Sequence, residues 1–473
     1  MWRYMRSTLL RLIPSPQAAA SVSPAKASSD RLRRRVVSPT SQGVPSGKAA
    51  ARATKRGLDH ASARHTADEE LLNGAETWAL VICQPLAQLS NQALLPSLGS
   101  MRADLSLSYV ELGWVVAAFG FARLLADLPA GGLASRWNPR IVLMVAFAAS
   151  AISSALGIFA TNVWQIAAVR LLIGIASSIA QAMILIWLVG GSGTAVRGRV
   201  MARSEAFFSV LGLVVPALGG LLAGPFGWRV AFVLGAVAAV VGLLAVFAFT
   251  QGGSAARAAG LEDRHAASRL ASSPPPPGWL ELRQGGHILL AAYLATFVVF
   301  FSRNGLLNAG LPVLGADKLG FQPFEIGLLF STMNAVAIGA VLLGGRLGDR
   351  FGRYRMLAPA VALLLAAQLL LFLIQDPLTY VIVGLLQGLS AFVNPLPASI
   401  LGDALPARLR GQGIAVYRAV CDVALLSAPA VLGLTLQLGG FAAAEFATAA
   451  ATLAVLVVIL ALGRSAQTTV PSR

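Results

Sequence analysis

Charged residues are few in this chain. Only 12% of its 473 residues are Asp, Glu, Lys or Arg, whereas 56% are hydrophobic, and the mean hydropathy is +0.72. In soluble proteins about a quarter of the residues are charged. The scarcity of charge excludes an ordinary soluble protein and indicates a membrane protein with several spans.

Cysteine and histidine are also scarce. Cys83 and Cys421 both fall in apolar runs, so no disulfide framework is indicated. All four histidines lie in tails or loops and lack the spacing of metal ligands. The sequence contains no phosphate-binding Gly-Lys-Ser/Thr loop and no catalytic constellation. We therefore expect no enzyme activity, no catalytic residues, no cofactor, no metal site and no ATP-driven step.

Acidic residues are outnumbered, with 20 Asp and Glu against 37 Lys and Arg, and the formal net charge is +17. Residues 1–58 alone hold twelve Lys or Arg and one acid, Asp30. Most other basic residues lie in short loops between apolar runs. This distribution does not indicate a nucleic-acid partner, and the lipid bilayer is the expected surrounding.

Residues 1–70 form a basic N-terminal segment that is rich in Arg, Ser, Ala and Pro. Its opening, MWRYMRSTLLRLI, sets Arg against apolar residues in a crudely amphipathic pattern. The composition is typical of a mitochondrial or plastid transit peptide, and a disordered basic tail is the alternative. In the first case the protein would lie in an organelle inner membrane. In both cases we expect the segment to lie outside the fold.

Twelve apolar segments follow, each near or above the ~20 residues that a helix needs to cross a bilayer. They cover residues 78–98, 109–131, 141–159, 163–190, 204–224, 230–249, 288–311, 324–344, 356–374, 378–401, 414–436 and 441–462. A polar, Pro-rich stretch separates the sixth from the seventh. The sequence predicts an N-terminal six-helix half (75–250), a flexible central loop (251–285), a C-terminal six-helix half (286–463) and a tail (464–473).

Basic residues are unevenly divided between the two sets of loops. The even-numbered loops, such as those after the second and eighth segments, are rich in Arg, whereas the opposite loops offer only Arg102, Arg229 and Lys318. By the positive-inside rule, both termini and the central loop should lie on the cytoplasmic, matrix or stromal face.

The two halves repeat each other. Glu111 and Glu325, Gly113 and Gly327, and Gly174 and Gly388 are all separated by the same interval along the chain. Pro96 and Pro312, and also Pro216 and Pro429, keep nearly the same interval. A nearly constant offset across several helices predicts an all-α membrane protein built as a parallel repeat, with a substrate site between the halves near the midplane.

Two loops carry related glycine- and arginine-rich motifs. Residues 344–355 read GGRLGDRFGRYR, and residues 131–140 read GGLASRWNPR. This paired signature resembles the loops of the major facilitator superfamily, and PALGG from Pro216 resembles the helix 5 motif of its drug and metabolite antiporters. The resemblance implies the twelve-helix facilitator fold. It also implies conformational loop residues, namely Gly131, Arg136, Arg140, Gly345, Asp349, Arg350, Gly352 and Arg353.

Amide side chains lie on the segments that line the central cavity in that family. The first segment carries them at helical spacing, the seventh offers Arg303 beside two asparagines, and the fourth and tenth contribute others. The predicted substrate-binding residues are Gln84, Gln88, Gln92, Gln181, Asn304, Asn308, Gln387 and Asn394. Amides donate and accept, which suits a polar organic solute; hydrogen bonding between helices is the alternative for each.

Four ionisable residues inside apolar segments are candidates for proton coupling: Asp127, Arg170, Arg418 and Asp422. The family resemblance assigns this role to Arg170. Burial raises and a nearby Arg lowers the pKa of a carboxyl, which would make either acid a switchable group. The alternatives are an Arg170 held by backbone carbonyls and helix 1 amides, and self-neutralised pairs Arg123–Asp127 and Arg418–Asp422.

The sequence thus predicts a secondary transporter, a monomer that moves a small organic solute by alternating access. Proton-coupled export or antiport is the preferred hypothesis. A facilitative uniporter and a membrane sensor on the same fold remain open.

Overall fold

The structure is a computed structural model that describes residues 72, 74–192, 194–250, 286–405 and 410–468. These residues belong to one compact unit, and their regular secondary structure is helical without strands. The predicted N-terminal segment (1–70), the central loop (251–285) and residues 469–473 of the tail lie outside them, so their character stays a prediction.

The first predicted span is a broken helix. Residues 78–98 fall into short pieces, which are α3 Gly74–Leu86, α4 Leu89–Leu94, η1 Leu95–Ser97 and α5 Leu98–Asp104. Pro85 lies in the last turn of α3 and Pro96 lies in η1. Proline removes a backbone donor and crowds the preceding turn, which accounts for breaks at these places.

Long helices complete the N-terminal half. They are α6 Tyr109–Arg136, α7 Pro139–Ile158, α8 Val163–Gly191, α9 Thr194–Phe226 and α10 Val230–Phe249. A capping box of Ser108 and Glu111 begins α6, and the Asn162 side chain caps α8. The predicted span 230–249 coincides with α10, whereas α9 begins well before residue 204.

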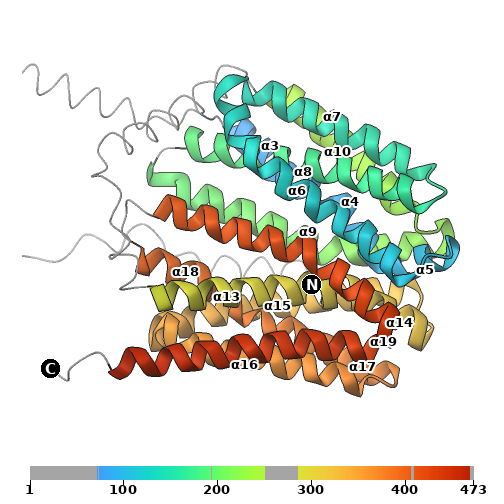
Figure 1. Cartoon of the computed structure of the whole chain (residues 1–473). Coiled ribbons are helices and arrows are strands. Elements are labelled where there is room, and N and C mark those ends of the chain that lie inside the picture. The colour runs from blue at the N-terminus through green and yellow to red at the C-terminus, as the bar shows by residue number, and fades with distance from the viewer. Residues whose placement is uncertain (1–71, 73, 193, 251–285, 406–409, 469–473) are drawn as a thin grey trace, which may run out of the picture. The chain divides into compact units, whose positions relative to one another are not determined.

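Two predicted spans of the C-terminal half are also interrupted. One is α13 Gly286–Ser302, the π-helix η2 Arg303–Gly310 and α14 Leu311–Leu319; the other is α17 Pro377–Ser390, η4 Ala391–Val393 and α18 Pro395–Ala404. The remaining elements are α15 Pro323–Phe351, α16 Arg353–Leu369, η3 Leu370–Leu373 and α19 Arg410–Thr468. At Gly440 (φ 68°) α19 doubles back, as Figure 1 shows.

Ten helices in the described part of the chain are long and apolar enough to cross a membrane. One of them, Val416–Leu462, contains the reversal at Gly440, and the broken first span is not among them. The chain is therefore an all-α, multi-pass membrane protein. Twelve crossings remain a prediction.

Contacts between helices confirm the internal repeat. A Cβ on Gly113 of α6 would meet the carbonyl of Pro429 on α19, and one on Gly327 of α15 would meet the carbonyl of Pro216 on α9. Gly113 and Gly327 are equivalent in the repeat, and so are Pro429 and Pro216. The contacts α6–α19 and α9–α15 are therefore equivalent seams between the halves. Such close approaches need glycine.

The two ends of the bundle differ in how the halves meet. We call the end with the α6–α7 and α15–α16 loops the basic-loop end, and the end with α5 and α14 the opposite end; Figure 1 shows them at left and right. One buried apolar cluster contains residues of both halves, among them Leu98 of α5, Leu314 of α14 and Leu432 of α19. This cluster joins the halves toward the opposite end.

Candidate transport site

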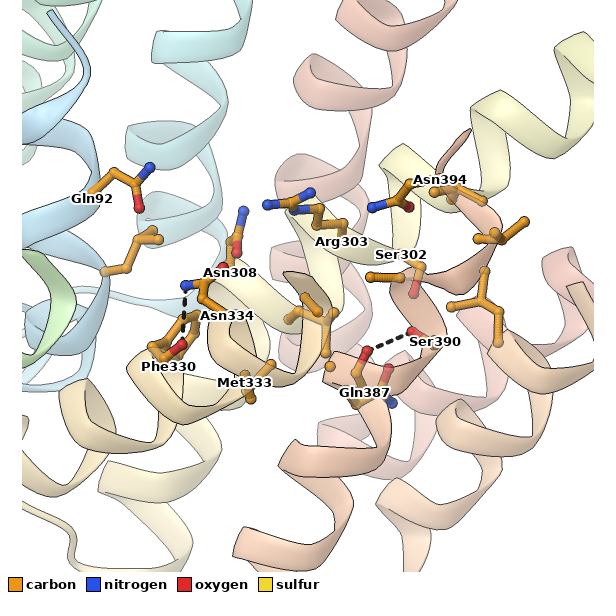
Figure 2. A pocket seen from close by; sticks show the side chains of 18 of the residues that line it. Gln92, Ser302, Arg303, Asn308, Phe330, Met333, Asn334, Gln387, Ser390 and Asn394 are labelled. Atoms are coloured by element: carbon orange, nitrogen blue, oxygen red, sulfur yellow. Dashed lines mark hydrogen bonds between the residues drawn. The ribbon is translucent and has the colours of Figure 1, made fainter. Parts of the chain in front are cut away.

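A cavity lies between the halves where the helices are interrupted. Its lining comes from α4 and η1 on one side and from α13, η2, α15, α17 and η4 on the other, with one residue from α16 (Figure 2). The polar lining residues are Asn91, Gln92, Ser302, Arg303, Asn308, Asn334, Gln387, Ser390 and Asn394. Apolar walls include Leu95, Phe330 and Met333. The cavity can therefore bind a polar solute.

Four predicted substrate-binding residues line this cavity, namely Gln92, Asn308, Gln387 and Asn394. The Gln387 amide donates from Nε2 to the carbonyl of Ala367 at 2.7 Å, while its Oε1 is buried without a donor among the described residues. That oxygen is an acceptor at the cavity wall that a ligand or water can satisfy.

The other four predicted residues lie outside the lining. Gln84 accepts a hydrogen bond from the Ser204 hydroxyl, and Gln181 accepts one from Arg123 at 3.2 Å. Asn304 donates to the carbonyl of Phe300 at 2.8 Å. Gln88 lies at the break between α3 and α4 and is buried. The contacts of Gln84 and Gln181 are the helix-to-helix bonds expected as the alternative, and a substrate role for all four stays a prediction.

Arg303 is the cation of the cavity lining. It begins the π-helix η2, and its side chain is exposed to the cavity (Figure 2). Among the described residues no acid lies within ion-pair distance of its guanidinium. A guanidinium keeps its charge in proteins, so the cavity carries a positive charge that no described acid neutralises.

The α15 lining was not foreseen from the sequence, which directed attention to the first, fourth, seventh and tenth spans. Asn334 donates to the carbonyls of Phe330 and of Gly212 on α9, at 3.0 and 2.9 Å. The polar residues Ser331, Thr332 and Asn334 within an apolar stretch were the available signal.

Arg170 is buried on α8, with only 2% of its surface exposed. It donates to the carbonyl of Val115 at 3.4 Å and to Oδ1 of Asn91 at 3.0 Å, and it lies 5.0 Å from the centre of the Phe119 ring. These partners match the backbone-and-amide alternative. Arg170 thereby fixes Asn91 at the cavity wall, and its role in coupling stays a prediction.

The acids of the two predicted ion pairs contact other residues. In the described residues neither Arg123–Asp127 nor Arg418–Asp422 forms an ion pair. The Ser178 hydroxyl donates to Oδ1 of Asp127, Arg418 is exposed, and Asp422 is 6% exposed. The Asp422 carboxyl lies within hydrogen-bonding reach of the Asp127 carboxyl. The self-neutralised pairs expected as the alternative are therefore not formed.

The second glycine-rich loop is held by ion pairs. Arg353 contacts Asp349 at 2.8 Å and Asp403 of α18 at 2.9 Å, after a turn at Gly352 with φ 92°. The close helix approach falls on Gly344, against Phe392, whereas a Cβ on Gly345 would meet open space. The Arg350 guanidinium lies 5.2 Å from the Phe351 ring centre.

The first glycine-rich loop contacts its own half. Arg140 donates to the carbonyl of Phe247 on α10 at 2.9 Å, and Arg136 is exposed. Gly131 lies within α6, in a stretch whose side chains are not described. Ser135 stands where the second loop has Asp349, which leaves this loop without the corresponding acid.

A polar contact joins the halves at the opposite end. Arg102 of α5 pairs with Asp317 of α14 at 2.8 Å. The Tyr109 hydroxyl donates to the same carboxylate at 3.0 Å, and the Arg102 guanidinium lies 4.6 Å from the Tyr109 ring centre. We call Arg102, Tyr109 and Asp317 the end latch.

A second polar cluster at this end lies within the N-terminal half. Asp104 accepts from the indole of Trp228 at 2.8 Å and from Arg229 at 3.0 Å. These bonds, the indole bond foremost, hold the pKa of the Asp104 carboxyl below its usual value. The described residues contain no cluster of three His, Cys, Asp or Glu that could hold a metal ion.

A sequence model of the Major Facilitator Superfamily matches residues 80–322 and 292–473. The chain belongs to this superfamily. The facilitator is therefore a transporter and not an enzyme, and the resemblance of its loops is confirmed.

Relatives of this facilitator fit the drug-transporter-like branch. Multidrug resistance protein 2 of Bacillus subtilis is 24% identical over 268 residues, which cover 56% of this chain and 64% of that protein. The probable sulfoacetate transporter SauU of Cupriavidus necator is 27% identical over 333 residues, 66% of this chain and 74% of that one. The match to the Bacillus protein thus spans less than two thirds of its length.

Solved structures share the fold. The crystal structure of a D-xylose-proton symporter superposes with a TM-score of 0.65 at 16% identity, over 82% of this chain and 96% of the symporter. At this identity the likeness extends to the fold alone.

Proposed function

We propose that this facilitator transports a small organic anion by alternating access of its two halves. The observation that carries the proposal is Arg303, a cation without a protein counter-charge among the described residues, in a cavity lined by amides. A charge at mid-membrane costs about 2.5–3.5 kcal/mol on insertion scales. A carboxylate or sulfonate in the cavity would offset this cost with a charge-assisted hydrogen bond.

The amides around Arg303 support the same substrate class. Asn308 and Asn394 lie on either side of it in Figure 2, and Gln92 faces them from the N-terminal half. Amide N–H groups donate to anionic oxygens, and amide carbonyls accept from substrate hydroxyls. A relative named for sulfoacetate, an organic anion, agrees with this class.

We further propose proton coupling, with export or antiport as the direction. The half-buried Asp127 and the buried Asp422 support coupling because they lie at a seam between the halves. Support for antiport comes from the helix 5 motif, whose Pro216 and Gly220 pack against α15 of the other half.

The expected organisation completes the proposal: two six-helix halves, 75–250 and 286–463, in a monomer with both termini on one face. Residues 1–70 serve as an organelle address. Expression of residues 1–70 fused to a fluorescent protein would test the address, and diffuse fluorescence would contradict it.

Transport by purified protein in proteoliposomes tests the substrate class. We expect uptake of at least one anion from a panel of small carboxylates and sulfonates, with no uptake of the matched neutral amides. Arg303→Gln should reduce that uptake by about tenfold or more, equivalent to ~1.4 kcal/mol. Arg199→Gln is the matched control, because Arg199 is exposed on α9 and does not line the cavity.

Three outcomes would contradict parts of the proposal. Wild-type rates in Arg303→Gln would refute the role of the cation. Anion uptake that ignores a pH gradient would identify a uniporter. No transport of any panel member, with signalling lost on deletion of residues 1–70, would favour the sensor.

A further inference from the structure

The carboxyls of Asp127 and Asp422 meet across the seam between the halves. Asp127 lies on α6, about two and a half turns before the helix ends at the basic-loop end. Asp422 lies on α19 of the other half and is 6% exposed. The two carboxyls are within hydrogen-bonding reach of each other.

The hydrogen bonds of Asp127 leave one of its oxygens without a donor. Oδ1 accepts from the Ser178 hydroxyl. Oδ2 is buried, and no described residue donates to it. A buried carboxylate oxygen without a donor is costly, and two adjacent carboxylates repel. One proton held between the two carboxyls removes both costs, as in other carboxyl dyads.

The charged groups around the pair do not replace that proton. Arg123 on α6 and Arg418 on α19 are near enough to interact with Asp422 through space, yet neither forms an ion pair with either acid. On α8, Ser178 and Gln181 face this region, and Gln181 accepts a hydrogen bond from the Arg123 guanidinium. On α19, Cys421 precedes Asp422, and Tyr417 contacts Cys421. On η2, the charged residue is Arg303, which lines the cavity.

The internal repeat supplies a comparison within the same molecule. At the repeat offset, the position equivalent to Asp127 is Val341 on α15, and the position equivalent to Asp422 is Ser209 on α9. The α9–α15 seam thus packs without a carboxyl pair at these positions. Packing of the seam does not require two acids, so their presence in α6–α19 calls for another cause.

We propose that Asp127 and Asp422 bind a single proton between them, and that this shared proton fastens α6 to α19 toward the basic-loop end. Release of the proton to water leaves two carboxylates, whose repulsion separates the helices at that end. The inference rests on the proposed proton coupling and names the device that performs it. One proton per pair, and not one per acid, is the distinguishing claim.

A spin-label distance measurement on the purified full-length protein tests this claim without a substrate. The labels replace Trp137 at the end of α6 and Ile414 on α19, which are 63% and 55% exposed, in a Cys83→Ala, Cys421→Ser background. Between about pH 5 and about pH 9, a range that covers buried carboxyl pairs, we expect a longer-distance population to grow with pH.

The two single variants and the double variant discriminate between a shared proton and separate protons. In Asp127→Asn or Asp422→Asn the amide donates to the remaining carboxylate at every pH, so the longer-distance population at high pH should fall by about tenfold. The double variant Asp127→Asn/Asp422→Asn should also lack the pH transition, and it should lose no transition that the single variants keep. Asp376→Asn is the matched control, because Asp376 caps α17 and asparagine caps equally well.

Two results would overturn the proposal. One is a wild-type distance distribution that does not change with pH. The other is a pH transition that survives in either single variant. Because no substrate is present, failure here is separate from failure of anion transport, which the proteoliposome assay measures independently.

Discussion

The end latch offers a prediction whose size can be worked out from its contacts. Arg102 and Asp317 join α5 to α14 at 2.8 Å, and their side chains are 24% and 17% exposed. Tyr109 adds a hydrogen bond to Asp317 at 3.0 Å. The proposed alternating access requires this end to open, so the latch should set the ratio of closed to open molecules at the opposite end.

The free energy that the end latch contributes should lie between the values for two known kinds of contact. Exposed ion pairs are worth about 0–1 kcal/mol, and hydrogen bonds to charged groups about 1.5–3 kcal/mol. For a pair with these exposures we expect about 1–2 kcal/mol, which changes the closed-to-open ratio by a factor of about 5–30. Asp317→Asn keeps the shape and removes the charge, and Arg102→Gln removes the partner charge.

Spin labels in place of Phe159 and Leu438 would report the opening, because these residues are 76% and 79% exposed at the opposite end. We expect both single variants to increase the open population, and the double variant to show a coupling of about 1 kcal/mol. Arg229→Gln is the control, since its partner Asp104 belongs to the same half. Unchanged distances in Asp317→Asn, or effects that simply add, would refute the reasoning.

Two further predictions concern a glycine and an acid. Gly113→Ala should slow transport by about tenfold or more, since the new Cβ would lie 2.5 Å from the Pro429 carbonyl oxygen. The control is Gly339→Ala, whose new Cβ would meet open space. Equal transport rates in the two variants would contradict the prediction. The lowered pKa of Asp104 means that its contribution to stability is present above its unfolded value of about 3.9 and is lost as pH falls through the lower folded value. The side chain is 51% exposed, so the contribution should be below about 1 kcal/mol. Thermal melting of wild type and Asp104→Asn should converge at acid pH, and a difference that grows on acidification would refute this sign.

Local signals in the sequence predicted the long helices well. The span 230–249 coincides with α10, whereas the capping box of Ser108 and Glu111 at the start of α6 was not predicted. The repeat predicted the paired seams because close packing at Gly113 and Gly327 depends on residue size, which a single sequence displays. The interruptions of the helices were harder to predict, because the π-helix at Arg303–Gly310 contains no proline that would mark it.

Partner choice between helices could not be predicted from spacing. Arg123 and Asp127 stand at i, i+4, where a salt bridge is worth only about 0.2–0.5 kcal/mol. Arg123 instead bonds to Gln181 on α8, and Asp127 meets Ser178 and Asp422. Three-dimensional packing decides between these options. The side of α15 that lines the cavity was not predicted either, because it also depends on three-dimensional packing.

The internal repeat separates what packing needs from what transport needs. Gly113 and Gly327 recur because both seams require a close approach. By the interval between Pro96 and Pro312, Arg303 has Ala87 at the equivalent position of the first half, and Asp127 has Val341 at the equivalent position of the second. A charge inside the membrane is costly, and a fold that packs once without it has no structural need of it in the other copy. The unpaired cavity cation and the carboxyl pair are therefore where substrate and proton binding should be sought first.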